Sequence, residues 1–223
     1  MASTVVQLTS VTKNVLHLLG SFHLGGSESQ AVQLISLLHQ ERSFRVFVAC
    51  LSKEGGLLPE IERLGYIDFP EFPLTSFYDR NALQQLMRCS RYIRENDIQI
   101  IQTHDFYTNV FGMLAGFLAR VPARIAAKRE TGMRTRGQRF VERRAFSMAD
   151  RVVVNAEAVK DYLIGSGVPP AKITTIHNGL NLSKVDSKEV GRRAVLEKLD
   201  LPSAATMQFV TILANLRSPV KNH

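Results

Sequence analysis

Short runs of branched apolar residues alternate with segments of helical periodicity along most of the chain, and this alternation constrains the fold more than any other feature. The expected strands are residues 15–19, 46–51, 67–69, 98–101, 124–127, 152–154 and 172–176. The expected helices are residues 31–38, 57–64, 83–95, 107–119 and 155–163, with a basic helix before residue 152. Nearly unbroken Val, Ile and Leu strands joined by helices predict a parallel sheet that is covered on both faces. We therefore expect a doubly wound, Rossmann-like α/β domain.

The alternation stops after Gly179, where the sequence becomes polar and then charged. We expect three regions: a Rossmann-like domain over residues 1–180, an interdomain linker over 181–207, and the first strand and loop of a truncated second domain over 208–223. The strand expected at 209–213 is followed by only ten residues, so nothing remains to pair with it or cover it.

Several classes of protein are disfavoured by composition. The longest apolar run, residues 110–119, is ten residues long, about half of the roughly 20 that a membrane-spanning helix needs. Residues 1–12 show neither the basic start nor the apolar core of a secretory signal. Cys50 and Cys89 are far apart and lack the spacing of metal ligands. We expect a cytoplasmic protein with two reduced, packed cysteines and no metal site.

The formal net charge is +8, and most of it comes from one segment. Nine basic residues lie between Arg120 and Arg144, against two glutamates. Such a surface attracts phosphates or anionic lipid head groups. The candidate anion or membrane face consists of Arg134, Arg136, Arg139, Arg143 and Arg144. A solvated helix face is the alternative, and nucleic acid is disfavoured because Phe140 is the only aromatic residue in the run.

Gly20, Gly25 and Gly26 lie between the first expected strand and the first expected helix. Backbone amides at that position can bind a phosphate, because the helix dipole favours an anion there. The loop lacks the lysine of a P-loop and the G-x-G-x-x-G pattern of dinucleotide-binding proteins. In the alternative, structural interpretation, the glycines only turn the chain and Ser27 caps the helix with Gln30.

His104 and Asp105 follow the strand expected at 98–101, at the edge where open α/β sheets bind their ligands. A histidine there can exchange a proton near neutral pH, although it can also serve only to hold the loop. His17, inside the first strand, is interpreted as a packed residue, and His177 is a secondary candidate at a strand exit. Gly112 and Gly116 are interpreted as close helix-to-sheet packing.

Five short motifs, in this order and spacing, resemble one family. They are residues 25–28 (Gly-Gly-Ser-Glu), 103–105 (Thr-His-Asp), 149–155 (Ala-Asp-Arg-Val-Val-Val-Asn), 177–180 (His-Asn-Gly-Leu) and 217–221 (Arg-Ser-Pro-Val-Lys). Together they resemble the retaining glycosyltransferases of family 4. These enzymes have the GT-B fold, in which two Rossmann-like domains face each other across a cleft. The resemblance covers the N-terminal domain and the first strand of the second.

The resemblance implies transfer of a sugar from a nucleotide-sugar donor to a glycan, lipid or small-molecule acceptor, with retention of the anomeric configuration. It implies no divalent metal and no other cofactor. His104 matches the family histidine near the transferred sugar and is the expected catalytic residue. Gly25 and Gly26 would approach the donor diphosphate, while Asp105 and Glu28 are candidates on the acceptor side.

Near the end of the chain, Lys221 would add a cation at the donor phosphate. Arg217 is a weaker match, because Leu216 stands where the family arginine is commonly found. The family's paired glutamates, eight positions apart in the second domain, are not present. We therefore expect the chain by itself to show no transfer activity. The alternative function is a non-catalytic module that binds anions or a membrane surface, peripheral at the inner face of a membrane.

Overall fold

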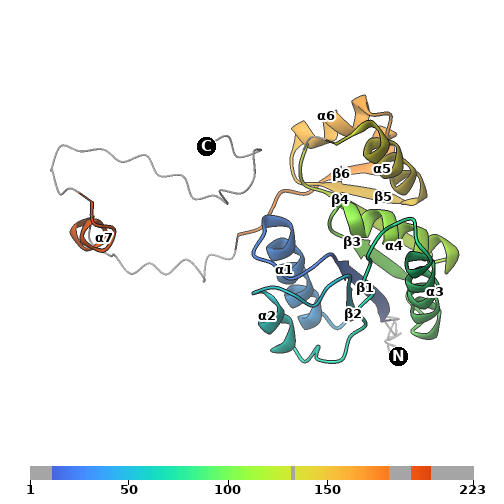
Figure 1. Cartoon of the computed structure of the whole chain (residues 1–223), viewed down its shortest axis with the longest axis horizontal. Coiled ribbons are helices and arrows are strands. Elements are labelled where there is room, and N and C mark those ends of the chain that lie inside the picture. Colours follow the sequence, from blue (N-terminus) through green and yellow to red (C-terminus); the bar gives the residue numbers. More distant parts are fainter. Residues whose placement is uncertain (1–11, 132–133, 181–191, 202–223) are drawn as a thin grey trace, which may run out of the picture. The chain divides into compact units, whose positions relative to one another are not determined.

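The structure, a computed structural model, describes residues 12–131, 134–180 and 192–201. The strands are β1 (Lys13–Leu19), β2 (Phe44–Cys50), β3 (Ile100–Thr103), β4 (Ala123–Lys128), β5 (Arg151–Val154) and β6 (Ile173–Thr175). The α-helices are α1 (Gly26–Gln40), α2 (Leu58–Glu62), α3 (Arg80–Glu95), α4 (Phe106–Leu118), α5 (Arg136–Met148), α6 (Glu157–Gly165) and α7 (Arg192–Lys198). A short 3₁₀-helix covers Pro170–Lys172. Figure 1 labels the strands and the α-helices along the chain.

The six strands form one parallel sheet in the order β2-β1-β3-β4-β5-β6. From β1 the chain moves outward to β2, and from β3 it moves in the opposite direction toward β6. Because crossovers between parallel strands are right-handed, the helices of these two halves cover opposite faces of the sheet. The doubly wound α/β fold predicted from the sequence is confirmed.

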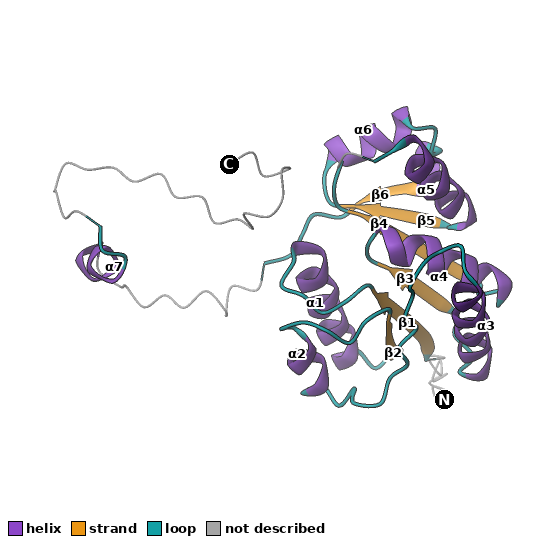
Figure 2. Ribbon diagram, in the orientation of Figure 1, coloured by secondary structure: helices purple, strands orange, loops and turns teal. Residues whose placement is uncertain are grey.

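Each face of the sheet has its own apolar core. The core under α1 and α2 contains Leu19, Ile35, Val48 and Ile61. The larger core under α3, α4, α5 and α6 contains Leu18, Ile93, Phe111, Phe146 and Leu163. Figure 2 shows the sheet between α1 and α2 on one side and α3 and α4 on the other. Cys50 and Cys89 are buried, unpaired thiols, and burial raises the pKa of each to about 12.

One expected strand, residues 67–69, is not formed. Two residues after the segment, Glu71 forms an isolated bridge with Cys50 at the end of β2. Pro70 has no N–H to donate to a ladder, and Ile67 is exposed rather than packed. A brief apolar run is therefore not enough to make a strand here.

The strand expected at 98–101 lies two residues further along, as β3. Ile98 remains in the turn that ends α3, where its N–H donates to the carbonyl of Ile93 at 3.1 Å. This shift places His104 directly after the last residue of the strand.

The close packing predicted for the two glycines of α4 is confirmed. A Cβ atom on Gly112 would lie 2.5 Å from Cγ2 of Thr103 and 2.7 Å from Cδ2 of Leu18. However, α4 is not buried all round as its sequence suggests, since Phe117 is 54 % exposed. None of the described helices is long and apolar enough to cross a membrane.

The chain divides into two compact units, Met1–Asn178 and Gly179–His223. Of the second unit, the structure describes α7 and the residues next to it. The strand expected at 209–213 lies outside the described residues. The domain boundaries at 180 and 207 therefore stay predictions.

Candidate functional site

A cavity of about 700 Å³ opens at the carboxyl edge of the sheet. Its wall includes residues that directly follow four strands: Gly20 and Ser21 after β1, Leu51 and Ser52 after β2, His104 and Asp105 after β3, and Arg129 and Glu130 after β4. β1 and β3 are neighbours in the sheet, and from them the chain leaves to opposite faces. Such a switch point is where open α/β sheets bind their ligands.

His104 lines this cavity, as its position after β3 predicted. Its ring is buried, and its Nε2 lies 3.1 Å from Nδ1 of His17. Burial is the main cause that keeps the pKa of His104 well below its usual value. Repulsion from His17 and from Arg129 lowers this pKa further. Near neutral pH the ring is therefore a neutral imidazole that can donate or accept a hydrogen bond. His17 is fully buried, as predicted, and burial lowers its pKa to about 4.

Asp105 has a structural role in addition to its place on the cavity wall. Its carboxylate caps α4 by accepting hydrogen bonds from the N–H groups of Tyr107 and Thr108, at 2.9 and 3.0 Å. It also accepts from the N–H of Gly20, at 3.0 Å, across the gap between β1 and β3. Burial raises the pKa of Asp105, while these hydrogen bonds oppose the rise. The carboxylate proposed for the acceptor side thus already has several protein partners.

The glycine turn before α1 differs in part from the prediction. Gly25 is the N-cap residue of α1, with no side-chain cap, so the alternative in which Ser27 caps the helix is wrong. The N–H of Gly25 donates to the carbonyl of His23 at 2.9 Å, which leaves it unavailable to a phosphate. A Cβ at Gly25 would meet only the end of the Glu28 side chain, so Glu28 would have to move for a larger residue to fit there. Gly26 stays a predicted phosphate ligand.

A cation that the sequence analysis did not single out lies beside the first turn of α1. Nη1 of Arg129 donates to the carbonyl of Ser27 at 3.4 Å, and burial lowers the pKa of Arg129. Glu28 and Ser27 both line the cavity, and burial is the main cause that raises the pKa of Glu28. Arg129 directly follows β4, so the rule that pointed to His104 after β3 also applies to Arg129.

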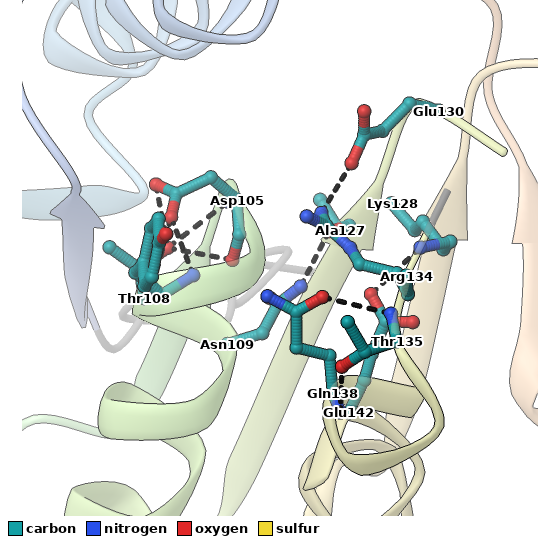
Figure 3. A network of polar contacts seen from close by, with 11 residues as sticks. Asp105, Thr108, Asn109, Ala127, Lys128, Glu130, Arg134, Thr135, Gln138 and Glu142 are labelled. Atoms are coloured by element: carbon teal, nitrogen blue, oxygen red, sulfur yellow. Dashed lines mark hydrogen bonds and ion pairs between the residues drawn. The ribbon is translucent and has the colours of Figure 1, made fainter. Parts of the chain in front are cut away.

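Polar contacts connect the cavity wall to α4, β4 and α5, as Figure 3 shows. Nζ of Lys128 lies 2.7 Å from Oε1 of Glu142, and both side chains are almost completely buried. The side-chain amide of Asn109 donates to the carbonyl of Ala127 at 2.9 Å. Buried charges of this kind are tolerated only when they are paired, so the pair fixes α5 against the end of β4.

Four of the five arginines of the predicted basic face lie on α5, and the fifth, Arg134, does not. Arg136, Arg139, Arg143 and Arg144 are exposed on α5. Arg134 instead precedes the helix, forms an ion pair with Glu130 (Figure 3), and lies with its guanidinium 4.5 Å above the ring of Phe106. It lines the cavity. The helical periodicity could not place Arg134, because it lies outside the helix, before its N-cap Thr135.

A second cavity, of about 530 Å³, is mostly apolar and lies among α3, α4 and α5. It shares Phe77, Phe106 and Tyr107 with the first cavity. The rings of Phe77 and Tyr107 are stacked, with centroids 5.8 Å apart. These aromatic residues were not singled out from the sequence, because the segment around Phe77 has no strand or helix to place it.

The remaining predicted residues stand as follows. Arg217 and Lys221 lie outside the described residues, so their donor-phosphate role stays a prediction. His177 is exposed and its Nδ1 lies 3.1 Å from the carbonyl of Asn155. In the described part of the chain no three His, Cys, Asp or Glu side chains are grouped so that they could hold a metal ion.

Three solved structures illustrate what the fold is similar to. HepE from Anabaena, in complex with UDP-glucose, matches with a TM-score of 0.66 and 17% identity, over 84% of this chain and 50% of HepE. A glycosyltransferase from Rickettsia africae matches with a TM-score of 0.62 and 14% identity, over 86% and 50% of the two chains. MnaA from S. aureus, solved with UDP, matches with a TM-score of 0.64 and 13% identity, over 85% and 52%.

At these identities the matches show the fold, which is the Rossmann-like α/β fold of a GT-B half. The chain spans about half the length of each of these proteins. A search of curated protein sequences found no match. The family model described as Glycosyltransferase Family 4 matches residues 24–184, well over half of the chain. The order of short motifs and the family model therefore agree, and the chain belongs to glycosyltransferase family 4.

Proposed function

We propose that the chain is the acceptor-side half of a retaining glycosyltransferase, which moves a sugar from a nucleotide-sugar donor to a glycan, lipid or small-molecule acceptor. The observation that carries the proposal is the cavity at the β1/β3 switch point, with His104 on its wall, in a chain of family 4. HepE and MnaA were solved with UDP-glucose and UDP, which supports a UDP-sugar as the first donor to test.

The expected chemistry is electrostatic stabilisation of the leaving group. When the glycosidic bond to the donor breaks, negative charge develops on the diphosphate. The helix α1 begins at Gly26, and the guanidinium of Arg129 donates to the carbonyl of the next residue, Ser27. A helix N-terminus with a cation beside it favours an anion. We propose that these groups face the leaving phosphate, and that no metal or other cofactor takes part. Lys221 stays a candidate for a further cation that acts on the donor phosphate.

His104 would act on the sugar side of the same step. Since its ring is neutral near pH 7, it would hydrogen-bond a hydroxyl group of the sugar rather than neutralise a phosphate. Glu28 and Asp105 border the same cavity and stay candidates for contacts with the acceptor.

A transfer assay tests this proposal. The natural gene product that contains these residues is incubated with UDP-glucose and other UDP-sugars and with a panel of acceptors, and the product is analysed for its anomeric configuration. Retained configuration and a loss of at least about 100-fold in kcat/KM for His104→Ala are expected. The control is His39→Ala, on the exposed last turn of α1. Inverted configuration, or full activity of His104→Ala, would contradict the proposal.

The 223-residue chain by itself is expected to give no product. Turnover by this chain at rates typical of enzymes, on the order of 1 per second, would show that the half-enzyme assignment is wrong.

A second candidate function rests on the exposed face of α5. Four exposed arginines lie on this helix: Arg136, Arg139, Arg143 and Arg144. Phe140 among them is 60 % exposed, with the guanidinium of Arg144 5.2 Å from its ring centroid. Cations with an exposed aromatic residue favour an anionic lipid surface. The alternative is therefore a module that binds a membrane peripherally at its cytoplasmic face.

Vesicle sedimentation tests the membrane candidate. Vesicles that contain about 30 mol % phosphatidylserine should bind the chain and sediment with it at low salt, and should release it as salt is added. The double variant Arg139→Gln and Arg143→Gln should bind less than the double variant Arg42→Gln and Arg63→Gln, which removes the same charge from exposed residues elsewhere. Equal binding of the two double variants would exclude α5 as the membrane face.

A further inference from the structure

Two histidine rings are paired inside the protein, one from β1 and one from the residue after β3. His17 lies within β1, and His104 directly follows β3. Their ring centroids are 5.3 Å apart and the ring planes are inclined by 20°. Nδ1 of His17 and Nε2 of His104 are 3.1 Å apart, within hydrogen-bond distance. The rings are 0 % and 3 % exposed, so solvent does not compete for this contact.

The two outer nitrogens of the pair have no partner among the described residues. Nε2 of His17 and Nδ1 of His104 are both buried without a hydrogen bond in the described part of the chain. Buried polar atoms are usually paired, so each such atom needs an explanation. His104 borders the cavity and His17 does not. Nδ1 of His104 is therefore the ring atom that remains for a ligand.

The contact links the tautomers of the two rings. Both rings are neutral near pH 7, because burial lowers the pKa of each, and a neutral imidazole has one donor and one acceptor nitrogen. If Nδ1 of His17 carries the shared proton, Nδ1 of His104 must carry the other proton and donate. If Nε2 of His104 carries the shared proton, its Nδ1 has a lone pair and accepts.

The surroundings of the pair keep the ring of His104 in place. Alternate residues of a strand point to the same face of the sheet. His17 therefore shares its face with Leu19, which belongs to the core under α1. The backbone N–H of His104 donates to Oγ1 of Thr108 at 3.1 Å, in the first turn of α4. The cation of Arg129, directly after β4, adds to burial and to His17 in lowering the pKa of His104. Without His17, the ring of His104 would keep its backbone anchor but lose the partner that selects its orientation and tautomer.

We propose that His17 is a positioning residue, which fixes the ring orientation and the tautomer of His104 so that Nδ1 of His104 meets a hydroxyl group of the sugar substrate. A hydroxyl group can both donate and accept, so it fits either tautomer of the linked pair. A phosphate oxygen can only accept, and a neutral ring gives it no charge. This inference rests on the proposed function for the identity of the ligand, but the linkage between the two rings does not.

Nitrogen NMR of the histidine side chains tests the linkage. The chain has six histidines, and ¹⁵N shifts separate protonated from bare ring nitrogens. In the wild-type chain at pH 7, one of the two contacting nitrogens should be protonated and the other bare. In His17→Leu, the ¹⁵N shifts of His104 should move to the average of two tautomers. His17→Asn, whose amide can replace Nδ1 of His17, should restore a single tautomer.

Unchanged shifts of His104 in His17→Leu would overturn the proposal. So would a wild-type chain in which both contacting nitrogens are protonated or both are bare. His39, whose Nδ1 lies 2.9 Å from Oη of Tyr66, reports whether the fold is intact. If His17→Leu does not fold, the wild-type pattern and the single tautomer in His17→Asn still decide the question.

Transfer kinetics of the natural gene product supply the functional readout. His17→Leu should lower kcat at least 10-fold, and His17→Asn should recover most of that loss. The double variant of His17→Leu with His104→Ala should be no worse than His104→Ala alone, because His17 acts through His104. Losses that multiply in the double variant would overturn the positioning role. If the wild-type protein transfers no sugar, the proposed function fails, while the NMR result still decides the linkage.

Discussion

Asp105 joins the ends of β1 and β3 at the cavity. Its carboxylate caps α4 and also accepts from the N–H of Gly20, the first residue after β1. A Cβ on Gly20 would lie 2.8 Å from Oδ2 of Asp105, so glycine is needed for this close approach. The position of His104, one residue before Asp105, therefore depends on this carboxylate.

Asp105→Ala is expected to destabilise the protein by about 2–4 kcal/mol. The change removes an N-cap and also leaves the partly buried N–H of Gly20 without its partner. Asp79→Ala is the matched control, because Asp79 caps α3 through the N–H of Ala82 but is exposed. Urea unfolding should give a clearly smaller loss for Asp79→Ala. Equal losses for the two variants would contradict the bridging role of Asp105.

The buried pair His17 and His104 should make stability depend on pH. The pKa of His17 is about 4 in the folded protein and about 6.5 in the unfolded chain, so the unfolded chain binds more protons between these values. Stability is therefore complete above pH 6.5 and is lost as the pH falls toward 4. For His17 alone, the free energy of unfolding should fall by about 2 kcal/mol between pH 7 and pH 5.

Denaturant unfolding at the two pH values measures this dependence. His17→Asn should lose less stability between pH 7 and pH 5 than the wild-type chain, whereas His39→Asn should behave like the wild-type chain. Burial is the main cause that raises the pKa of Asp105 and of Glu28 in the folded protein, so both groups act in the opposite direction. The same pH dependence in His17→Asn and in the wild type would argue against the buried neutral pair.

At the scale of elements, the sequence pattern predicted where the strands and helices lie because burial leaves a clear pattern. The strands of this sheet are covered on both faces and are nearly continuous apolar runs. Local rules were less successful. The Ser27 cap follows a good motif, yet Gly25 is the N-cap residue. Residues 67–69 have strand-like composition, yet Pro70 ends any ladder there.

The packing of α4 against the sheet gives a prediction with a matched control. Gly112→Ala should destabilise the protein by about 1–3 kcal/mol, because the added methyl group meets Thr103 and Leu18. The same substitution at Gly137, in the first turn of α5, meets no atom of the described residues within 4 Å and should stabilise the protein by about 0.5–1 kcal/mol. Thermal unfolding of the two variants should show shifts of opposite sign. A neutral Gly112→Ala would show that α4 does not lie this close to β3.

At the scale of the whole molecule, the site forms where the two halves of the sheet diverge. The sequence could predict His104 there, because the carboxyl end of a predicted strand specifies the edge. It could not predict the pairing of His104 with His17, since the two are 87 residues apart and their contact depends on the strand order. Arg134 was also misplaced, because its contact with Phe106 depends on how α5 packs beside α4.

The most direct test of the account is whether sugars bind at this cavity. The chain is titrated with a panel of oligosaccharides at millimolar concentrations and followed by ¹H–¹⁵N NMR. At least one sugar should shift the amide signals of Ser27, Thr75 and Tyr107. These three residues lie on different segments of the cavity wall. His104→Ala should weaken that binding, and the amide of Leu37, exposed and toward the other end of α1, should not move. Shifts confined to other surfaces, or no shift with any sugar, would contradict the account.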